Sequence, residues 1–557
     1  MRRSRRLLAA LAALALAGCT ALPDSGPVYT SNPRLPERSE VDVLYSGPTN
    51  NAEPREIIEG FLAASAAGYS DEFAAAKLYL TETAALSWDP YAGVDVIDSA
   101  EPIPPEEVES GGVRVTSMSL AEVDSRGRYT VRRQPVEVVR TFSLIKNAAG
   151  QWRIATLPNG IAIPDVRFEQ IFDRVPLYFI TPDTEVLVPE ARWFPRPHLV
   201  SGALAALLSG PSSWLQPGVR TAVPDGTRIN GNIATTNDAV TVDLTVPGER
   251  PDANQLQLIY TQIQRTIAGS GTVQSVQLRI NGTQVIPVAA APVIEAPNPA
   301  SQPLAISAGN LVRWNGRDLV PVPNPAGVEG PLASPSAPFD GSAGPIVVLD
   351  ATGSVRTIPA GQGPSEVLIE GPDLIPPSVD RLGWVWSGPR QARGSLTVTQ
   401  HAGQSQQVDA PWLDGPEVMR ARISADGARA LILMRVGTTV VVRVATVIRD
   451  ENGTPTGLAS PEDIVLPTGS VLDADWVGGS DVAILVRDQL ASDPAVTIAT
   501  LGGPRTTLPP IPGATQIASG NSDRSIVVAT EIGDLYVRAG AGWSLAASGV
   551  TDPNYAG

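Results

Sequence analysis

The sequence predicts a multidomain protein in which two α+β domains are followed by an all-β propeller, behind an N-terminal signal peptide. Three observations support this prediction. The chain opens with an arginine-rich and then apolar segment, residues 53–288 mix helical and alternating apolar patterns, and residues 304–557 carry short strand patterns without helical periodicity. With 557 residues the chain exceeds the usual size of one hydrophobic core, so several domains are expected.

Residues 1–18 are predicted to form a lipoprotein signal peptide. Four arginines precede the apolar run Leu7–Leu16. A helix of about ten residues covers roughly half of a bilayer core, so this run is a signal segment rather than a membrane span. The motif Leu16-Ala17-Gly18-Cys19 resembles the lipobox of bacterial lipoproteins, which predicts cleavage between Gly18 and Cys19 and lipidation of Cys19. Cys19 is the only cysteine of the chain, and a secretory signal with a chance cysteine is the alternative.

The composition bears on partners and location. The formal net charge is −16, which does not favour binding to nucleic acid or to anionic lipid head groups. No stretch after residue 19 holds about 20 continuous apolar residues, so no later transmembrane helix is expected. The mature chain is therefore expected on the extracytoplasmic face of the cell membrane, with acyl chains on Cys19 as its membrane contact.

Residues 19–52 are predicted to be a proline-rich tether, because five prolines lie among polar residues without a helical period. Residues 53–165 are predicted to be an N-terminal α+β domain. One helix is expected to begin at Glu53-Pro54 and a second to run from Ser70 to Leu80. Strands are then expected at 113–115, 129–131, 136–144 and 152–154.

Residues 175–288 are predicted to be a second α+β domain. A strand at Val175–Ile180 precedes a helix whose apolar face includes Leu199, Leu204 and Leu207. The alternating strand Val240–Val246 is followed by a helix that Asp252 is expected to cap. Residues 289–303 are read as a linker, since they are rich in alanine and proline.

Residues 304–557 are predicted to be the β-propeller. Short motifs recur about every 45 residues, each before an apolar strand, and this spacing fits four short strands per blade. The motifs are Ser334-Pro335-Ser336, Ser378-Val379-Asp380, Ser424-Ala425-Asp426-Gly427, Leu472-Asp473-Ala474-Asp475 and Ser519-Gly520-Asn521-Ser522. Five units are visible, and pairing of residues 304–321 with the C-terminus would complete a sixth. A sandwich with coincidental spacing is the alternative.

This order of domains resembles the actinobacterial lipoprotein LpqB family. The middle domain resembles the GerMN domain, first named from spore germination proteins. The residues that carry this second likeness are Val175–Phe179, Leu207–Pro211, Val240–Leu244, Gln262–Ile267 and Val276–Gly282. The resemblance covers nearly the whole chain, and the domain order is more specific than any single motif.

The resemblance implies an accessory role beside a two-component system. Members of the family look like lipoproteins that act on the extracytoplasmic part of the sensor histidine kinase MtrB and affect cell-envelope homeostasis and division. A sensor histidine kinase is therefore the partner that the resemblance implies, and the membrane is contacted through the lipid anchor.

The residues offer little catalytic chemistry. The chain has two histidines, His198 and His401, and no Gly-x-Ser-x-Gly elbow is apparent, so no catalytic residue is predicted. Too few ligands exist for a zinc site, and no nucleotide-binding motif occurs in its required setting, so no metal and no cofactor are predicted. Four aspartates recur at the repeat positions, and turn stabilisation is favoured over acid–base chemistry or calcium binding for them: Asp380, Asp426, Asp473 and Asp475.

Tryptophan and arginine clusters are the candidate partner-binding residues, because these side chains are enriched at protein interfaces. For Arg192-Trp193-Phe194, contact at the surface and packing in the core stay equally open. For Trp384 and Trp386, which share one face of a strand, packing between blades is the favoured alternative.

Three functions follow from these features. A regulatory binding lipoprotein is favoured, because small domains and propellers present rigid recognition surfaces. A lipoprotein that binds the glycan of peptidoglycan is the second, and it requires an exposed aromatic platform. An envelope hydrolase is the third, and it requires clustered carboxylates at the mouth of the propeller channel.

Overall fold

The computed structural model describes residues 47–557, apart from residues 101–103, 109–111, 184–185, 237–238, 272, 287–293, 298–301, 324–327, 329, 340–343, 360–362, 401–402, 404 and 467–468. The predicted signal peptide, its cleavage site at Gly18 and the lipid-bearing Cys19 lie outside the described residues. So does most of the predicted tether.

The N-terminal domain begins with the predicted helix, α2 (Pro54–Ala66), whose first turn is closed by a capping box between Glu53 and Glu56. The second predicted helix is wrong in its extent. A 3-10 turn (η1, Gly68–Ser70) and two short helices, α3 (Ala74–Lys77) and α4 (Glu82–Ser87), replace it. The cause is Phe73, whose φ of 60° breaks the helix and turns its fully buried ring under Gly68.

The sheet of this domain has the strand order β5-β4-β3-β1-β6, and β2 pairs with β3. Its strands are β1 (Gly93–Ile97), β2 (Glu106–Val108), β3 (Gly112–Asp124), β4 (Tyr129–Lys146), β5 (Trp152–Thr156) and β6 (Ile161–Pro164). Two predicted strands have merged into β4. The register pairs Ala121 with Val131 and Ser119 with Val136, so residues 132–135 form a bulge that accommodates Pro135.

A short helix, α5 (Asp165–Ile171), leads from this sheet into the middle domain. There β7 (Phe172–Ile180) and β8 (Val186–Pro195) form a hairpin, which β14 (Ile294–Glu295) extends. A second sheet holds β9 (Arg228–Ile229), β10 (Ala234–Thr236), β11 (Ala239–Thr245), β12 (Ser275–Ile280) and β13 (Thr283–Gln284).

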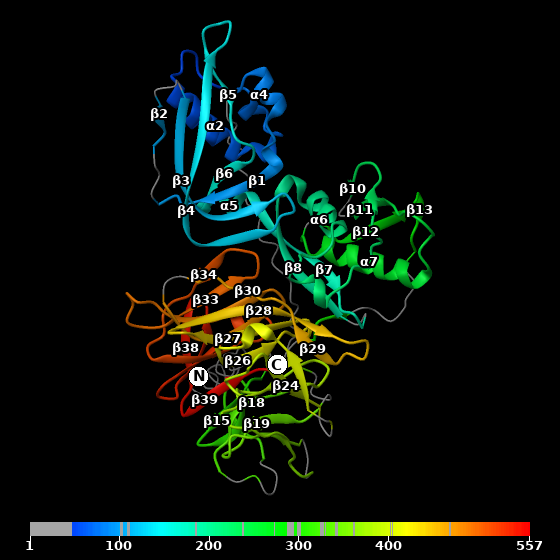
Figure 1. The fold of residues 1–557 in the computed structure, drawn as a ribbon, viewed down its shortest axis with the longest axis vertical. Coiled ribbons are helices and arrows are strands. Elements are labelled where there is room, and N and C mark those ends of the chain that lie inside the picture. The colour runs from blue at the N-terminus through cyan, green and yellow to red at the C-terminus, as the bar shows by residue number, and fades with distance from the viewer. Residues whose placement is uncertain are drawn as a thin grey trace, which may run out of the picture. The chain divides into compact units, whose positions relative to one another are not determined.

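Helices α6 (Leu199–Leu208) and α7 (Ala253–Ala268) lie beside each other against these strands (Figure 1). Asp252 caps α7 as predicted, because its side chain accepts a hydrogen bond from Gln255 N at 2.8 Å. The predicted apolar face of α6 is buried at Leu199, Leu204 and Leu207. The two helices and the two sheets therefore share one hydrophobic core.

The C-terminal domain is a β-propeller, and its described strands form six blades. Blades two, five and six are four-stranded sheets of consecutive strands, β18–β21, β31–β34 and β35–β38. Blades three (β22–β25) and four (β26, β27, β28 and β30) are joined through β29 (Pro455–Leu458), which pairs with both β25 and β28.

The bounds of these strands are as follows. Blade two has β18 (Ala333–Ser336), β19 (Ile346–Leu349), β20 (Val355–Ile358) and β21 (Val367–Ile369); blade three has β22 (Ser378–Val379), β23 (Val385–Ser387), β24 (Ser395–Thr399) and β25 (Gln406–Asp409). Blade four has β26 (Glu417–Ile423), β27 (Arg429–Val436), β28 (Thr439–Arg449) and β30 (Glu462–Asp463). Blade five has β31 (Ser470–Val477), β32 (Asp481–Arg487), β33 (Ala495–Thr500) and β34 (Arg505–Thr507); blade six has β35 (Ala514–Ala518), β36 (Val527–Thr530), β37 (Leu535–Ala539) and β38 (Gly542–Ala547).

Blade one closes the ring. It combines β15 (Leu304–Ser307), β16 (Asn310–Trp314) and β17 (Leu319–Pro321) with β39 (Val550–Asn554) from the end of the chain. Figure 1 shows β39 beside β15, and the register pairs Ile306 with Thr551. The predicted pairing of residues 304–321 with the C-terminus is confirmed.

Polar side chains of the innermost strands link each blade to the next. Ser378 Oγ, for example, accepts a hydrogen bond from Ile423 N at 3.1 Å. The other links, in order around the ring, are Asn554 to Pro335, Ser336 to Val379, Arg422 to Asp475, Asp475 to Ser519, and Gln516 to Asp552. The recurring motifs in the sequence mark several of these linking residues, which gives the repeat of about 45 residues a physical cause.

The middle domain rests on the propeller inside one compact unit, Ser46–Gly557. Its hairpin β7–β8 forms ion pairs with the blades, through Arg174 Nη1 to Asp481 Oδ1 at 2.7 Å and through Asp183 to Arg381. The loop after α6 approaches just as closely, since a Cβ on Gly218 would lie 2.3 Å from Thr446 Cγ2. The two domains are therefore in van der Waals and ionic contact.

Candidate functional site

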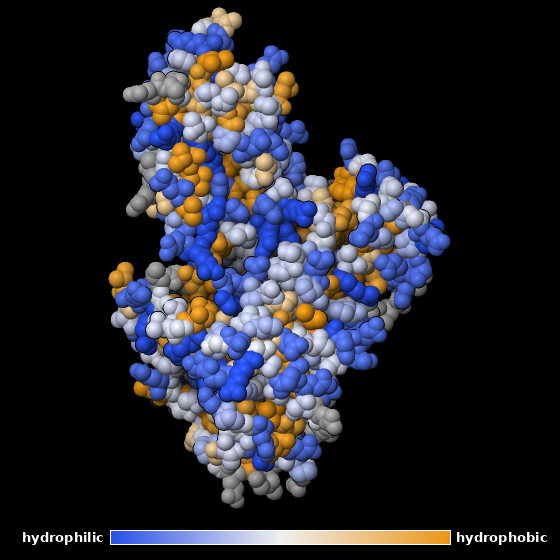
Figure 2. Space-filling view, viewed as in Figure 1, coloured by the Kyte–Doolittle hydropathy of each residue, from blue (hydrophilic) through white to orange (hydrophobic). Residues whose placement is uncertain are grey.

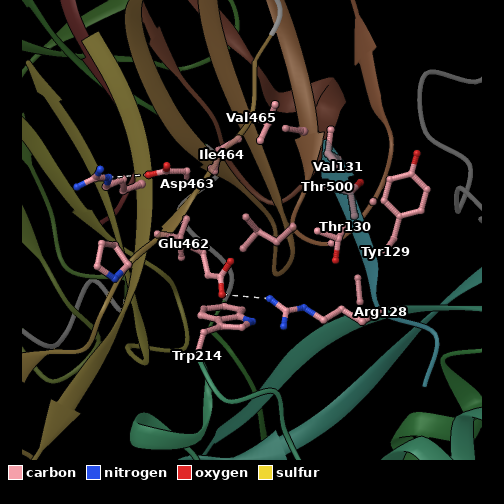
Figure 3. Close-up of a pocket in the computed structure, with 18 of the residues that line it drawn as sticks. Arg128, Tyr129, Thr130, Val131, Trp214, Glu462, Asp463, Ile464, Val465 and Thr500 are labelled. Carbon is pink, nitrogen blue, oxygen red and sulfur yellow. Dashed lines mark hydrogen bonds and ion pairs between the residues drawn. The ribbon is translucent and has the colours of Figure 1, made fainter. Parts of the chain in front are cut away.

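A cleft of about 540 Å³ opens where the three domains meet. The start of β4 forms one wall, the segment around Ala191 and Trp214 of the middle domain forms another, and blades four and five form the third. Figure 3 shows Tyr129 and Arg128 on the side of β4 and Glu462 to Val465 on the side of the propeller. Ligand sites occur preferentially at such domain junctions.

The bulge in β4 directs two arginines to opposite sides. Arg132 turns back onto its own sheet, where it donates to Ser119 Oγ at 3.0 Å and to Glu122 Oε2 at 2.8 Å. Arg133 extends across the cleft and pairs with Asp463 of β30. The bulge thus brings a cation of the N-terminal domain to the propeller.

Two further ion pairs lie in the cleft. Arg128 Nη2 lies 3.1 Å from Glu462 Oε1, and Figure 3 shows this pair beside the indole of Trp214. Arg443 Nε lies 2.6 Å from Asp463 Oδ1, so Asp463 is shared between Arg443 and Arg133. These pairs are partly exposed, and each contributes about 1 kcal/mol or less to stability.

Arg505 is the fourth arginine of the cleft, and it has no carboxylate partner among the ion pairs of the described residues. Its Nη1 donates to the carbonyl oxygen of Val465 at 2.8 Å. Desolvation by neighbouring atoms lowers the pKa of Arg505, although the nearby Tyr129 opposes this shift. Burial in turn raises the pKa of Tyr129 to about 12, so the phenol is neutral at physiological pH.

Two tryptophans add apolar surface to the cleft. Trp412 is held by a hydrogen bond from its Nε1 to the carbonyl oxygen of Ala459 at 3.1 Å. The backbone of Trp214 is fixed by Thr446, whose Oγ1 donates to the Trp214 carbonyl oxygen at 2.7 Å. The cleft therefore combines aromatic side chains and arginines on rigid supports, which is the composition of protein-binding hot spots.

Each of the three domains matches a known family model. The family model described as "Lipoprotein LpqB, N-terminal domain" matches residues 47–169, and the one described as "Lipoprotein LpqB beta-propeller domain" matches residues 309–556. Between them, residues 176–286 match the model described as "Sporulation and spore germination". The chain belongs to the lipoprotein LpqB family.

Two relatives named lipoprotein LpqB support this membership, one over nearly the full length and the other over about half of it. The protein of Streptomyces coelicolor is 27% identical over 97% of this chain and 96% of its own length. That of Cutibacterium acnes is 30% identical, over 51% of this chain and 48% of its own length. Among solved structures, TolB from Acinetobacter baumannii matches 60% of this chain and 83% of its own, with 14% identity and a TM-score of 0.37.

For Arg192-Trp193-Phe194 the sequence left surface contact and core packing equally open, and the structure shows that the segment is buried. Its place among the candidate partner-binding residues is therefore corrected. Trp193 contacts the rings of Tyr129 and Phe168, and its Nε1 donates to the Gly502 carbonyl oxygen at 2.9 Å. Phe194 is only 5% exposed. The segment is therefore a contact surface between the chain's own three domains, and burial explains why it is not free to bind a partner.

Arg192 is buried inside the middle domain, next to the contact surface formed by Trp193 and Phe194. It is 4% exposed, and its Nη2 donates to Glu190 Oε1 and to Ser212 Oγ, each at 2.9 Å. Ser212 N in turn donates to Glu190 Oε2 at 3.1 Å. This paired network fixes the backbone that forms the base of the cleft.

Trp384 and Trp386 are also corrected as partner-binding residues, because they are 7% and 0% exposed. Trp386 Nε1 donates to Asp380 Oδ2 at 3.1 Å, inside the apolar cluster of blades three and four. The packing alternative that the sequence favoured is the one that the structure shows.

The four repeated aspartates divide into two groups. Asp380 and Asp426 accept hydrogen bonds from backbone N–H groups of their own turns, so turn stabilisation is confirmed for them. For Asp473 and Asp475 it is wrong, because both lie on β31 and accept from Ile517 N and Ser519 N of the next blade. Packing of blades around an axis, which determines this difference, is not visible in local sequence.

A second cavity, of about 220 Å³, lies near the propeller axis, with Arg422 and Asp475 in its wall. Arg422 Nη1 lies 3.3 Å from Asp475 Oδ2. Burial raises the pKa of Asp475, which the charge of Arg422 opposes. Both groups help to join blades, because Arg422 Nη1 donates to Asn554 Oδ1 at 2.5 Å and Asp475 Oδ2 accepts from Ser519 N at 2.8 Å.

The described residues contain no helix long and apolar enough to cross a membrane. Among these residues, no group of three or more histidines, cysteines or carboxylates is placed to hold a metal ion. His198 packs edge-on against Tyr91 at a ring distance of 6.1 Å, whereas His401 lies outside the described residues.

Proposed function

We propose that this LpqB family member is a membrane-anchored, extracytoplasmic accessory protein. It binds the extracytoplasmic part of a sensor histidine kinase of the MtrB kind, and through that kinase it affects cell-envelope homeostasis and division. The observation that carries the proposal is the cleft between the three domains. Tyr129 and three of its arginines lie on strands, whereas Trp214 lies in a turn and Trp412 in the 3-10 helix η5 (Pro411–Leu413).

On the face drawn in Figure 2, the surface outside the cleft is mostly polar, which fits a partner that carries polar and charged groups. Apolar residues occur there in small groups among polar ones. A large exposed apolar patch would instead indicate a hydrophobic protein interface or a membrane contact. A partner with polar and charged groups therefore fits this face better than a purely apolar one.

Membrane attachment rests on Cys19 in the proposal. A lipid anchor there would place the folded domains beside a membrane-bound kinase on the same side. The predicted tether of residues 19–52 could reach on the order of 100 Å when fully extended, so the domains can meet a sensor domain above the lipid head groups.

The carboxylates near the propeller axis favour a binding role over a hydrolytic one, because their hydrogen bonds and ion pairs already engage them in the fold. Asp473 and Asp475 each accept a backbone hydrogen bond from the next blade, and arginines lie 3.5 and 3.3 Å from them. An acid or base needs a proton that can move to a substrate, and these groups are engaged in structure.

The kinase assignment is tested by direct binding. The full-length lipoprotein, purified in detergent micelles, is titrated against the extracytoplasmic domain of the cognate kinase by biolayer interferometry. We expect saturable binding. A wild-type chain that binds purified peptidoglycan in a sedimentation assay but not the kinase domain would replace this proposal with the glycan-binding alternative.

The anchor is tested separately. Replacement of Cys19 with alanine is expected to release the protein from the membrane fraction, because the acyl chains are its proposed membrane contact. Fractionation and immunoblotting measure this release. Retention of the variant in the membrane fraction would contradict the lipid anchor.

A further inference from the structure

The charges of the cleft do not balance. Its lining includes four guanidinium groups, of Arg128, Arg133, Arg443 and Arg505, and three carboxylates, of Glu190, Glu462 and Asp463. Glu190 is neutralised by Arg192, which does not line the cleft. Four cations therefore face two remaining carboxylates, an excess of two positive charges in a chain whose net charge is −16.

Arg505 carries one of the two excess positive charges, and it is the one arginine of the cleft lining without a carboxylate partner in the described ion pairs. Arg128 has Glu462 as its partner, and Asp463 already serves two arginines. Arg505 donates only to the Val465 carbonyl oxygen in the described hydrogen bonds, and a guanidinium has five N–H donors in a planar fork. A carboxylate could accept two of them side by side, which makes the strongest kind of charged hydrogen bond.

The remaining walls favour a peptide over a rigid small ion. Tyr129, Trp214 and Trp412 give the cleft aromatic surface. A volume of about 540 Å³ is far larger than a lone carboxylate or phosphate needs, and it matches several side chains of an extended segment. Tryptophan, tyrosine and arginine together are also the residues that dominate binding energy in protein interfaces.

We propose that the cleft receives an acidic segment of a protein partner, and that a carboxylate of this segment pairs with Arg505. The identity of that partner as the kinase rests on the proposed function. The charge preference of the cleft does not, because it follows from the lining residues alone.

The charge preference is tested with a defined probe. Fluorescein-labelled hexaglutamate is titrated against the full-length protein in detergent micelles, and binding is followed by fluorescence anisotropy. We expect binding that weakens about tenfold or more in Arg505→Glu, since a charged hydrogen bond is replaced by repulsion. Raising NaCl from about 0.05 to about 0.5 M is also expected to weaken binding, because salt screens exposed charges.

Matched variants separate a local effect from a general one. Arg317→Glu makes the same charge change at an exposed turn of blade one, and it is expected to leave hexaglutamate binding unchanged. Arg505→Gln removes the charge without repulsion, and its thermal unfolding midpoint should stay close to that of the wild type, since only the exposed hydrogen bond to the Val465 carbonyl oxygen is lost. Equal binding by wild type and both Arg505 variants would overturn the proposal, as would binding of a neutral chitin oligosaccharide without any binding of hexaglutamate.

Binding of the kinase domain to the same variants is a separate test from binding of hexaglutamate. If the kinase domain binds wild type and Arg317→Glu but loses about tenfold or more with Arg505→Glu, the cleft is its contact site. If the kinase domain does not bind the wild type at all, the proposed function fails, and the hexaglutamate result alone decides the chemistry of the cleft.

Discussion

At the scale of single residues, one type of turn recurs in five places of the described chain. In each case an aspartate or asparagine accepts hydrogen bonds from the N–H groups two and four residues later, and a glycine three residues later has a φ between 75 and 81°. The turns are Asp124–Gly127, Asn147–Gly150, Asp350–Gly353, Asp380–Gly383 and Asp450–Gly453. Such turns can be predicted from local sequence, because both required residues lie within it.

The Asp350 turn predicts a dependence of stability on pH. Partial burial alone would raise the pKa of Asp350, but hydrogen bonds from Thr352, Ser354 and Arg356 outweigh it and lower that pKa. The stability that the carboxylate contributes is therefore present above its ordinary pKa of about 3.9 and is lost as pH falls through the lowered value.

Asp350→Asn should keep the turn, since Asn147 fills the same role in its own turn, and should remove that acid-dependent loss. Unfolding midpoints of the two proteins, followed by circular dichroism at neutral pH and near pH 3, measure the difference. Asp350→Ala should lose about 1 kcal/mol at neutral pH. An equal acid-induced loss in wild type and Asp350→Asn would contradict the assignment.

Trp193 shows what single-residue patterns cannot predict. Its neighbours in sequence indicated a contact surface, but nothing local says whether the contact is with another protein or with the chain's own domains. Contact with Tyr129 and hydrogen bonding to Gly502, residues far away in sequence, decide the matter.

Two variants at Trp193 test its role at the junction. Trp193→Ala should destabilise the protein by about 3–5 kcal/mol, because it empties a large buried site. Trp193→Phe keeps most of the ring contacts but loses the hydrogen bond to Gly502, which should cost about 1 kcal/mol. Hydrogen exchange of the Gly502 loop should rise in both variants, and unchanged exchange in Trp193→Ala would contradict the account.

At the scale of elements, periodic patterns predicted the strands well where burial alternates locally. The alternating strand predicted at Val240–Val246 is β11 (Ala239–Thr245), shifted by one residue at each end, whereas the bulge that joins two predicted strands into β4 was missed. The bulge depends on the register against β3, which is a pairing between chain segments and has no period of its own. The same applies to β29, which pairs with two blades.

Closure of the ring is the element-scale feature with the clearest consequence. Val550 and Tyr555 are 0% and 5% exposed, and Asn554 links blade one to blade two through Pro335. A chain that ends after Ala547 loses these contacts and leaves β15 as an open edge. We therefore expect thermal unfolding at a lower temperature and over a broader temperature range. Each large buried side chain removed contributes about 2 kcal/mol.

A synthetic peptide of residues 548–557 should restore the transition of the truncated chain, because it supplies the missing strand. A scrambled peptide of the same composition is the control. Calorimetry measures both. Rescue by the scrambled peptide, or a truncated chain with wild-type stability, would contradict closure through β39.

At the scale of the whole molecule, the domain order was predictable from the sequence, but the cleft was not. Arg128 and Glu462 are separated by 334 positions, and no pattern within either segment indicates that they meet. Residues with strong local signals, such as Trp384 and Trp386, became core instead. The site is assembled by domain contacts, so it emerges only from the fold.

Site-specific photocrosslinking in cells tests most directly whether this cleft is where the partner binds. A photoreactive amino acid replaces Thr130, which is exposed in the cleft, and in a second strain it replaces Leu490, which is 98% exposed outside it. The account predicts an adduct with the sensor kinase from position 130 and none from position 490. A kinase adduct from position 490 together with none from position 130 would contradict it.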